Sequence, residues 1–169
     1  SCDTQACSGG HPEWHIQANV LNILNGGNFS KQNGNLVIVE EWDMMIAHPP
    51  CTYLSYAATK WWNDEGRLRK RLKALDFFAE LWLAKIDKIC IENPMGCASP
   101  TIAKYSQIIQ PYQFGDRESK KTCLWLKNLP LLKSTKIVKP KVYGYYKKGK
   151  KKGMPIYGNS YLKFSEDRG

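Results

Sequence analysis

The sequence predicts an α/β fold, in which a mostly parallel sheet carries helices on both faces and is followed by a basic, loop-rich C-terminal segment. Two short apolar runs, ending at residues 47 and 91, are each stopped by a proline-containing turn. A long amphipathic stretch lies between them. Strand, long helix, strand is the pattern of a parallel βαβ unit. The chain of 169 residues is long enough for one domain with a substantial core.

The first half of the chain contains two predicted strands and one predicted helix. The β-branched run 36–39 predicts a short strand. Residues 42–47 predict a buried strand that ends before Pro49 and Pro50, where the chain loses backbone donors. Residues 66–85 form the clearest helix, because apolar residues recur along one face. That face comprises Leu68, Leu72, Leu75, Ala79 and Trp82.

The second half continues with shorter elements. Residues 88–91 predict a second buried strand, which ends at Asn93-Pro94. Ser99-Pro100 predicts a short helix with serine as the N-cap and proline at the first position. Residues 107–114 and 122–126 predict two further strands joined by a polar turn that contains glycine. After Pro130 the periodicity ends, which indicates loops or a hairpin.

The charge of the chain is concentrated near its C-terminus. The net charge is +10, and residues 119–165 contain thirteen lysines and no acidic residue. This asymmetry predicts a polyanionic partner, most simply nucleic acid, with a solvated basic segment as the alternative. Lysines interleaved with tyrosines suit phosphate contact combined with base stacking. The lysines that we assign to this role are Lys147, Lys148, Lys150, Lys151 and Lys152.

The cysteines and the hydropathy indicate a cytoplasmic protein, of a bacterium or a phage-infected cell. Six cysteines occur without a CxxC pair, as expected for reduced thiols. Neither a secretory signal nor a membrane-spanning segment is recognisable, so no membrane partner is expected. Cys2, Cys7, His11 and His15 have a spacing that is compatible with zinc, but no repeat supports this interpretation and we assign no metal.

A cysteine and a glutamate follow the two apolar runs that frame the predicted helix. Cys51 comes directly after Pro49-Pro50, and Glu92 ends the second run. Carboxyl ends of parallel strands open onto the same edge of a sheet, so both side chains can reach one pocket. Cysteine is a strong nucleophile, and the two prolines stiffen the approach to it. Glu92 can donate a proton or a hydrogen bond.

This pair of residues suits the activation of a pyrimidine ring. A thiolate can add to carbon 6 while an acid at ring nitrogen 3 accepts the displaced charge, after which carbon 5 becomes nucleophilic. Each motif taken alone is also typical of an ordinary turn. Their order and their placement on successive strands favour an active site.

Three segments resemble motifs of the DNA cytosine-5 methyltransferases, and most closely those of the short phage and prophage proteins of this family. Residues 42–51 together with Ser55 resemble the nucleophile motif of the family. Ile91-Glu92-Asn93-Pro94 resembles its Glu-Asn motif, and residues 114–124 resemble the later glycine-containing and basic segment that contacts DNA. The similarity covers roughly residues 1–135.

The resemblance implies a fold, a reaction and a set of site residues. It implies a Rossmann-like methyltransferase sheet in a partial catalytic domain (1–135), and a minimal nucleic-acid-contacting region (136–169). By resemblance, Cys51 attacks carbon 6 of a flipped cytosine in DNA, Glu92 assists at nitrogen 3, and S-adenosylmethionine donates the methyl group. The catalytic motifs also include Pro50, Ser55 and Asn93. The residues implied in DNA contact are Lys120, Lys121 and Thr122, and those implied in cofactor binding are Asp3, Asn19, His48 and Pro49.

The chain departs from the family in one respect that bears on activity. The glycine-rich loop that binds S-adenosylmethionine after the first strand has no counterpart here, so we expect a sheet truncated at its N-terminus that binds the cofactor weakly or not at all. Two alternatives therefore stay open beside the methyltransferase: a non-catalytic nucleic-acid-binding module of the same shape, and another pyrimidine-modifying chemistry at the same site. The oligomeric state is open as well.

Overall fold

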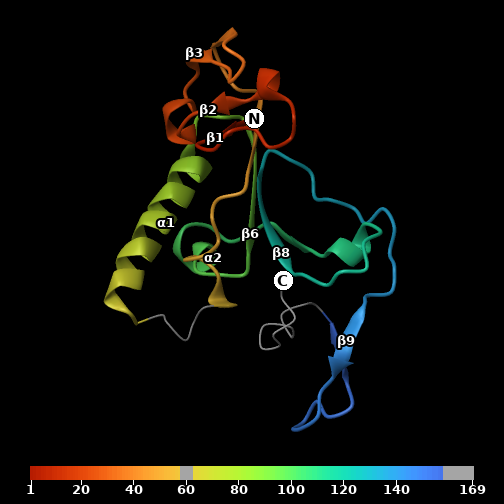
Figure 1. The fold of residues 1–169 in the computed structure, drawn as a ribbon. Coiled ribbons are helices and arrows are strands. Elements are labelled where there is room, and N and C mark those ends of the chain that lie inside the picture. The colour runs from red at the N-terminus through yellow and green to blue at the C-terminus, as the bar shows by residue number, and fades with distance from the viewer. Residues whose placement is uncertain (58–62, 158–169) are drawn as a thin grey trace.

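A computed structural model describes residues 1–57 and 63–157 of the chain (Figure 1). The N-terminal part consists of two small sheets, which Figure 1 shows at one end of the molecule. β1 (Cys2–Asp3) and β2 (Ile16–Gln17) pair in parallel, and β3 (Gly27–Ser30) and β4 (Leu36–Val39) form an antiparallel hairpin. Two 3₁₀ turns connect them, η1 (Pro12–Trp14) and η2 (Val20–Asn22).

A four-stranded sheet lies at the centre of the structure. Its strands are arranged in the order β5 (Met44–Ala47), β6 (Lys88–Pro94), β8 (Thr122–Lys127) and β7 (Gln107–Ile109). β5 runs parallel to β6, whereas β8 is antiparallel to both of its neighbours. A 3₁₀ turn, η4 (Pro111–Gln113), follows β7.

Two helices pack against one face of this sheet. α1 (Glu65–Leu83) begins at Asp64, whose side chain accepts a hydrogen bond from the backbone N–H of Arg67, as expected of an N-cap residue. α2 (Ala98–Thr101) is a single turn. Phe78 of α1 meets Trp125 of β8 edge to face, with ring centroids 5.0 Å apart. The buried residues around this contact include Leu54, Leu81, Ile89, Ile91, Ala98 and Cys123.

The C-terminal described segment is a β-hairpin. β9 (Val142–Tyr145) and β10 (Pro155–Tyr157) pair in antiparallel fashion, and Figure 1 shows the hairpin projecting from the body of the molecule. Its base is anchored, because Lys141 N–H donates to the carbonyl of Arg117 and the Tyr143 hydroxyl donates to Glu118. The latter hydrogen bond raises the pKa of Tyr143 above its ordinary value. Among the described residues, no helix has the length and apolarity needed to cross a bilayer.

The expected fold class is wrong. One strand pair of the central sheet is parallel and two are antiparallel, and the hairpins elsewhere add further antiparallel pairs. In the described ranges, the helices contribute their buried residues to one face of the sheet, while Met44 and Ile46 on the other face are 42% and 60% exposed. The fold is therefore not a Rossmann-like, mostly parallel sheet with helices on both faces.

The local sequence explains this difference. Along β6, buried Ile89 and Ile91 alternate with half-buried Cys90 and Glu92, which is typical of a strand covered on one side. A parallel connection requires a crossover of a dozen or more residues, usually a helix. The chain between β7 and β8 contains only the turn η4, so β8 returns antiparallel to β7.

Most of the predicted elements exist, but several boundaries differ. The strand 36–39 is confirmed, the helix predicted for 66–85 spans 65–83, and the second buried strand continues three residues further, to Pro94. The short helix begins at Ala98 with Cys97 as its N-cap, so the assignment of Ser99 to that role was wrong. The strand predicted for 107–114 ends at Ile109, because Pro111 has no N–H to donate and starts a 3₁₀ turn instead. The end of the predicted basic segment, 158–169, lies outside the described residues.

Candidate functional site

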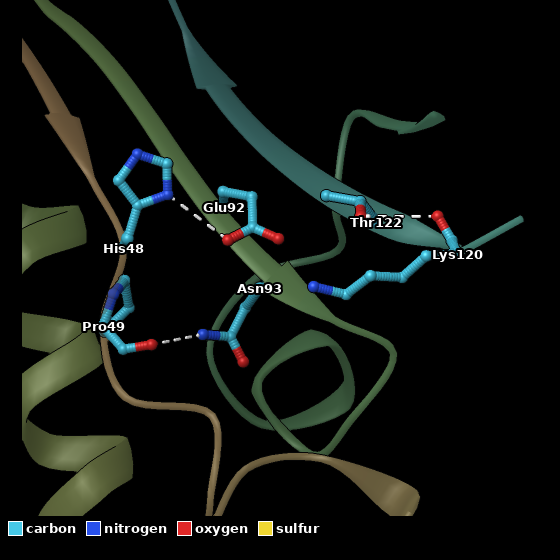
Figure 2. A network of polar contacts seen from close by, with 6 residues as sticks. All are labelled: His48, Pro49, Glu92, Asn93, Lys120 and Thr122. Atoms are coloured by element: carbon cyan, nitrogen blue, oxygen red, sulfur yellow. Dashed lines mark hydrogen bonds and ion pairs between the residues drawn. The ribbon is translucent and has the colours of Figure 1, made fainter. Parts of the chain in front are cut away.

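The register of β5 against β6 determines which residues meet beyond the end of β5. Within the parallel ladder Ile46 lies opposite Cys90, and Ala47 lies opposite Ile91. The next two residues on each side, His48-Pro49 after β5 and Glu92-Asn93 in β6, continue the same pairing. His48 therefore meets Glu92, and Pro49 meets Asn93, as Figure 2 shows. Because side chains alternate along a strand, the first contact lies on the open face of the sheet and the second on the buried face.

The contact on the open face joins an imidazole to a carboxylate. His48 Nδ1 lies 3.3 Å from Glu92 Oε2, within hydrogen-bonding distance. The side chain of His48 is 66% exposed and that of Glu92 is 26% exposed. The glutamate is thus partly shielded from water, whereas the histidine remains in exchange with solvent.

The contact on the buried face fixes the turn that carries the nucleophile. Asn93 is buried, with 1% of its surface exposed, and its Nδ2 donates a hydrogen bond of 2.7 Å to the carbonyl oxygen of Pro49. Pro49 is itself buried. Since Cys51 is two residues further along a chain stiffened by Pro50, the asparagine of the Glu-Asn motif holds the backbone that presents the thiol.

Cys51 is exposed and lies in a turn that is held by backbone hydrogen bonds. The carbonyl of Cys51 accepts hydrogen bonds from the backbone N–H groups of Leu54 (3.1 Å) and Ser55 (3.0 Å). Cys51 is the cysteine that the structure exposes, while the other five are half-buried or buried. Burial raises the pKa of four of these thiols, which keeps them protonated: Cys2, Cys90, Cys97 and Cys123.

The segment that follows β6 holds this turn in place through backbone contacts. Cys97 N–H donates to the carbonyl of Leu54 (2.9 Å), and Ser55 forms an antiparallel bridge with Gly96. A Cβ atom on Gly96 would lie 2.0 Å from the Leu54 carbonyl oxygen, so only glycine permits this approach. The Ser55 hydroxyl accepts a hydrogen bond from Ala57 N–H, which gives it a local role in the turn.

We therefore expect Gly96→Ala to destabilise the protein by about 2–3 kcal/mol, because the segment at Gly96 must move away from Leu54 to relieve the steric overlap. The displaced turn would carry Cys51 with it. Urea denaturation measures the first effect, and the alkylation rate of Cys51 measures the second. Gly9→Ala is the matched control, since a Cβ there meets nothing within 4 Å. Equal stability of the two variants would contradict the role assigned to Gly96.

The first turns of α1 also hold the Cys51 turn. Arg67 Nη2 donates a hydrogen bond of 3.1 Å to the carbonyl of Thr52, and its guanidinium lies 5.2 Å from the centroid of the Tyr53 ring. Lys70 Nζ lies 5.7 Å from the same centroid. Helical periodicity alone places both cations on the polar side of the helix. Their contacts with Thr52 and Tyr53 could not be predicted, because no local pattern indicates that the first turn of α1 lies against the Cys51 turn.

The basic residues predicted to contact DNA lie at two places. Lys120 and Lys121 precede β8 and are exposed; Figure 2 shows the Lys120 side chain extending toward Glu92 and Asn93. Thr122 pairs with Pro94 in the sheet, and its hydroxyl lies 3.5 Å from the Lys120 carbonyl oxygen. The second group lies at the exposed tip of the β9–β10 hairpin and comprises Lys147, Lys148, Lys150, Lys151 and Lys152.

The structure separates the remaining cofactor candidates from this site. Asp3 lies in β1 and Asn19 caps η2, both in the N-terminal part, which Figure 1 shows at the end of the molecule where β5 and β6 begin. Trp42 Nε1 donates to the Ile23 carbonyl and ties this part to the start of β5. Asp3 accepts from Gln5 N–H and Asn19 from Leu21 N–H, so both side chains serve local turns. His48 and Pro49 do lie at the site, in the contacts described above.

The cysteines and histidines near the N-terminus do not converge. Both ring nitrogens of buried His15 have partners, the Ser1 hydroxyl at 3.0 Å and the Gln5 carbonyl at 2.8 Å. Cys2 donates to the Ala18 carbonyl, and His11 stacks on Trp14. Within residues 1–57 and 63–157, no three His, Cys, Asp or Glu side chains group closely enough to hold a metal. The zinc interpretation therefore finds no geometric support.

No protein-family model, no curated protein and no solved structure matches this chain. The chemistry of the site is therefore inferred from its geometry. The contact of His48 with Glu92 was missed from the sequence, although one signal existed. Both residues directly follow predicted neighbouring strands, so a parallel pairing extended by one residue would have brought them together.

Proposed function

We propose that this chain carries the base-activating half of a DNA (cytosine-5-)methyltransferase reaction. The observation that supports it is the hydrogen bond from Asn93 to the Pro49 carbonyl, which joins the turn of Cys51 to the strand end that carries Glu92. Cys51 adds to carbon 6 of cytosine, and Glu92 gives a proton to ring nitrogen 3. Carbon 5 of the adduct is then nucleophilic. Lys120, whose side chain extends toward Glu92 and Asn93 in Figure 2, is suited to a phosphate or to the ring carbonyl of the same nucleotide.

S-adenosylmethionine would supply the methyl group in the complete reaction. The residues that would hold it do not fit this role in the present chain. Asp3 lies in β1 and Asn19 caps η2, in the N-terminal part that Figure 1 shows where β5 begins, whereas Cys51 follows the end of β5. The side-chain oxygens of Asp3 and Asn19 already accept backbone hydrogen bonds. The cofactor therefore takes no part in the activity proposed for this chain. The activity proposed for this chain is reversible activation of the ring, with a proton from water as the electrophile at carbon 5.

This proposal can be tested without a methyl donor. Once carbon 5 has taken a proton from water, it can lose the hydrogen that it carried before, and Cys51 then leaves carbon 6. An oligonucleotide with tritium at carbon 5 of deoxycytidine should therefore release tritium to water when incubated with the protein. Mass spectrometry of the recovered nucleosides would show a different outcome if the site performs another pyrimidine modification. Intact cytosine with full retention of tritium would contradict the proposal.

The basic hairpin favours a second candidate, a nucleic-acid-binding module without catalysis. The five tip lysines named above are exposed and lie on a hairpin that projects from the body. Tyr145 on the same hairpin is 60% exposed, so an aromatic ring is available beside the charges. This surface would bind a polyanion whether or not Cys51 reacts. Salt-dependent binding with no tritium release would favour the binding module.

Changing the five tip lysines to glutamine should weaken DNA binding about 100-fold at 150 mM salt. Each phosphate contact that is lost removes about 0.9 from the slope of log affinity against log salt, so the slope should decrease by about 3–5. Fluorescence anisotropy over 50–300 mM salt measures both quantities.

The matched control changes five lysines outside the hairpin, which lowers the net charge by the same amount: Lys31, Lys85, Lys88, Lys104 and Lys133. An equal loss of affinity in this control would show that net charge, and not the hairpin, determines binding.

A further inference from the structure

The imidazole of His48 touches the carboxylate of Glu92 at a point where the proposed reaction needs a proton. We propose that His48 is a positioning residue that stores this proton and returns it to Glu92, so that activation of the ring proceeds near neutral pH. This inference rests on the proposed function, because the proton is the one that Glu92 delivers to nitrogen 3. The resemblance assigned His48 to the cofactor, whereas its contact in the structure is with the acid.

The geometry gives the two ring nitrogens different surroundings. Nδ1 faces Glu92 Oε2 at 3.3 Å, and Figure 2 shows the other nitrogen on the far side of the ring. Because the side chain is 66% exposed, the far nitrogen can exchange protons with water. Glu92 is 26% exposed, and a bound base would cover it further. His48 thus connects a covered acid to solvent.

The step balances without any oxidant or reductant. At rest the pair holds one proton, which lies on His48 Nδ1 and faces the Glu92 carboxylate. As the thiolate of Cys51 forms a bond to carbon 6, the electron pair displaced through the ring reaches nitrogen 3, which takes a proton from Glu92 while Glu92 takes the proton of His48 Nδ1. Neutral His48 then regains a proton from a water molecule, and the hydroxide formed is neutralised by the buffer. When the adduct reverses, each transfer runs backwards.

Several other ionisable groups surround the pair. Lys120 extends toward Glu92 from the segment before β8 and brings a positive charge to this side of the pair. Cys90 lies two positions before Glu92 on β6, and Cys123 lies opposite Asn93 on β8. Burial raises the pKa of both thiols, and the charge of Glu92 raises it further, so both stay neutral in the working range. These thiols therefore do not compete with His48 and Glu92 for the transferred proton.

The experiment is the pH profile of tritium release. An asparagine amide can occupy the position of Nδ1, so His48→Asn keeps a donor toward Glu92 but removes the titratable proton. The proton must then reside on glutamate alone, whose ordinary pKa is about 2 units below that of histidine. We expect the descending limb of the profile to move about 2 units toward lower pH, with about 100-fold slower release at pH 7.5.

Imidazole rescue separates proton storage from a structural role. In His48→Gly, added imidazole should restore release, and the restored rate should follow the ionisation of imidazole. His11→Asn is the matched control, because His11 Nδ1 also contacts a carboxylate, Glu13 Oε1 at 3.0 Å, but far from Cys51. An unchanged profile in His48→Asn, or His48→Gly that imidazole does not rescue, would overturn the role of His48 alone. Absence of release from the unaltered protein would overturn the proposed function as well.

Discussion

Cys51→Ser should abolish tritium release, with a decrease of about 10³-fold or more. A serine hydroxyl is far less ionised than a thiol near neutral pH. The fold should survive, because the side chain is exposed and surface substitutions usually change stability by less than about 0.5 kcal/mol. DNA affinity should also stay within about twofold, since the basic hairpin is intact.

The matched control for this variant is Cys7→Ser. Cys7 is half-buried, its backbone N–H donates to the side chain of Gln32, and it lies in the N-terminal part of the chain. Tritium release should be unaffected there. Release that persists in Cys51→Ser would remove Cys51 from the mechanism, whereas loss of release in both variants would point to a general effect on folding.

Asn93→Asp should destabilise the protein by about 3 kcal/mol at pH 7. The substitution keeps the shape of the side chain but replaces the donor to the Pro49 carbonyl by a buried carboxylate, which has no partner there. The turn that carries Cys51 would lose its attachment to β6. We expect tritium release to decrease about 100-fold, because a nucleophile displaced by about 1 Å loses most of its alignment.

The stability of this variant should depend on pH in a predictable direction. In the folded state the introduced carboxyl is buried, so its pKa is raised above the unfolded value of about 3.9. When protonated, it can donate to the Pro49 carbonyl as asparagine does. The penalty is therefore small below pH 4 and grows as the pH rises through the unfolded pKa, until the folded group ionises.

Urea denaturation at several pH values measures this dependence. Asn33→Asp is the control, because exposed Asn33 accepts a hydrogen bond from Asn35 N–H, which a carboxylate can accept equally well. A stability loss in Asn93→Asp that stays constant from pH 4 to pH 8 would contradict the proposed role of the buried amide.

The elements that local pattern determines were predictable from the sequence. The strand 36–39, the long helix and the strand from Lys88 follow from β-branched runs, periodic leucines and a proline stop. Whether β8 returns parallel or antiparallel depends on the connection from β7. A turn was correctly predicted there, but its consequence for strand direction was not drawn, because the whole sheet was classed from the single strand–helix–strand unit before it. The sheet class was therefore wrong although most strands were correct.

The candidate site shows the same division between local and non-local information. Cys51 and Glu92 were proposed from local pattern, because Cys51 follows an apolar run and the turn signal Pro49-Pro50, and Glu92 ends an apolar run before Asn93-Pro94. The contact of His48 with Glu92 depends on register, which the pattern of either strand alone does not contain. Asp3 and Asn19 were assigned by resemblance, and no local pattern indicates that Trp42 attaches their part of the chain to the beginning of β5.

The continuation of the β5–β6 register past Ala47 determines where this chain can tolerate changes in length. The turn that follows this stretch is held by Gly96, Cys97 and Arg67, which contact Ser55, Leu54 and Thr52. One residue inserted or deleted between Met44 and Pro49 would reverse the alternation of side chains, turning His48 toward the core and Pro49 toward the open face. In functional relatives of this chain, insertions and deletions should therefore be absent from this short stretch.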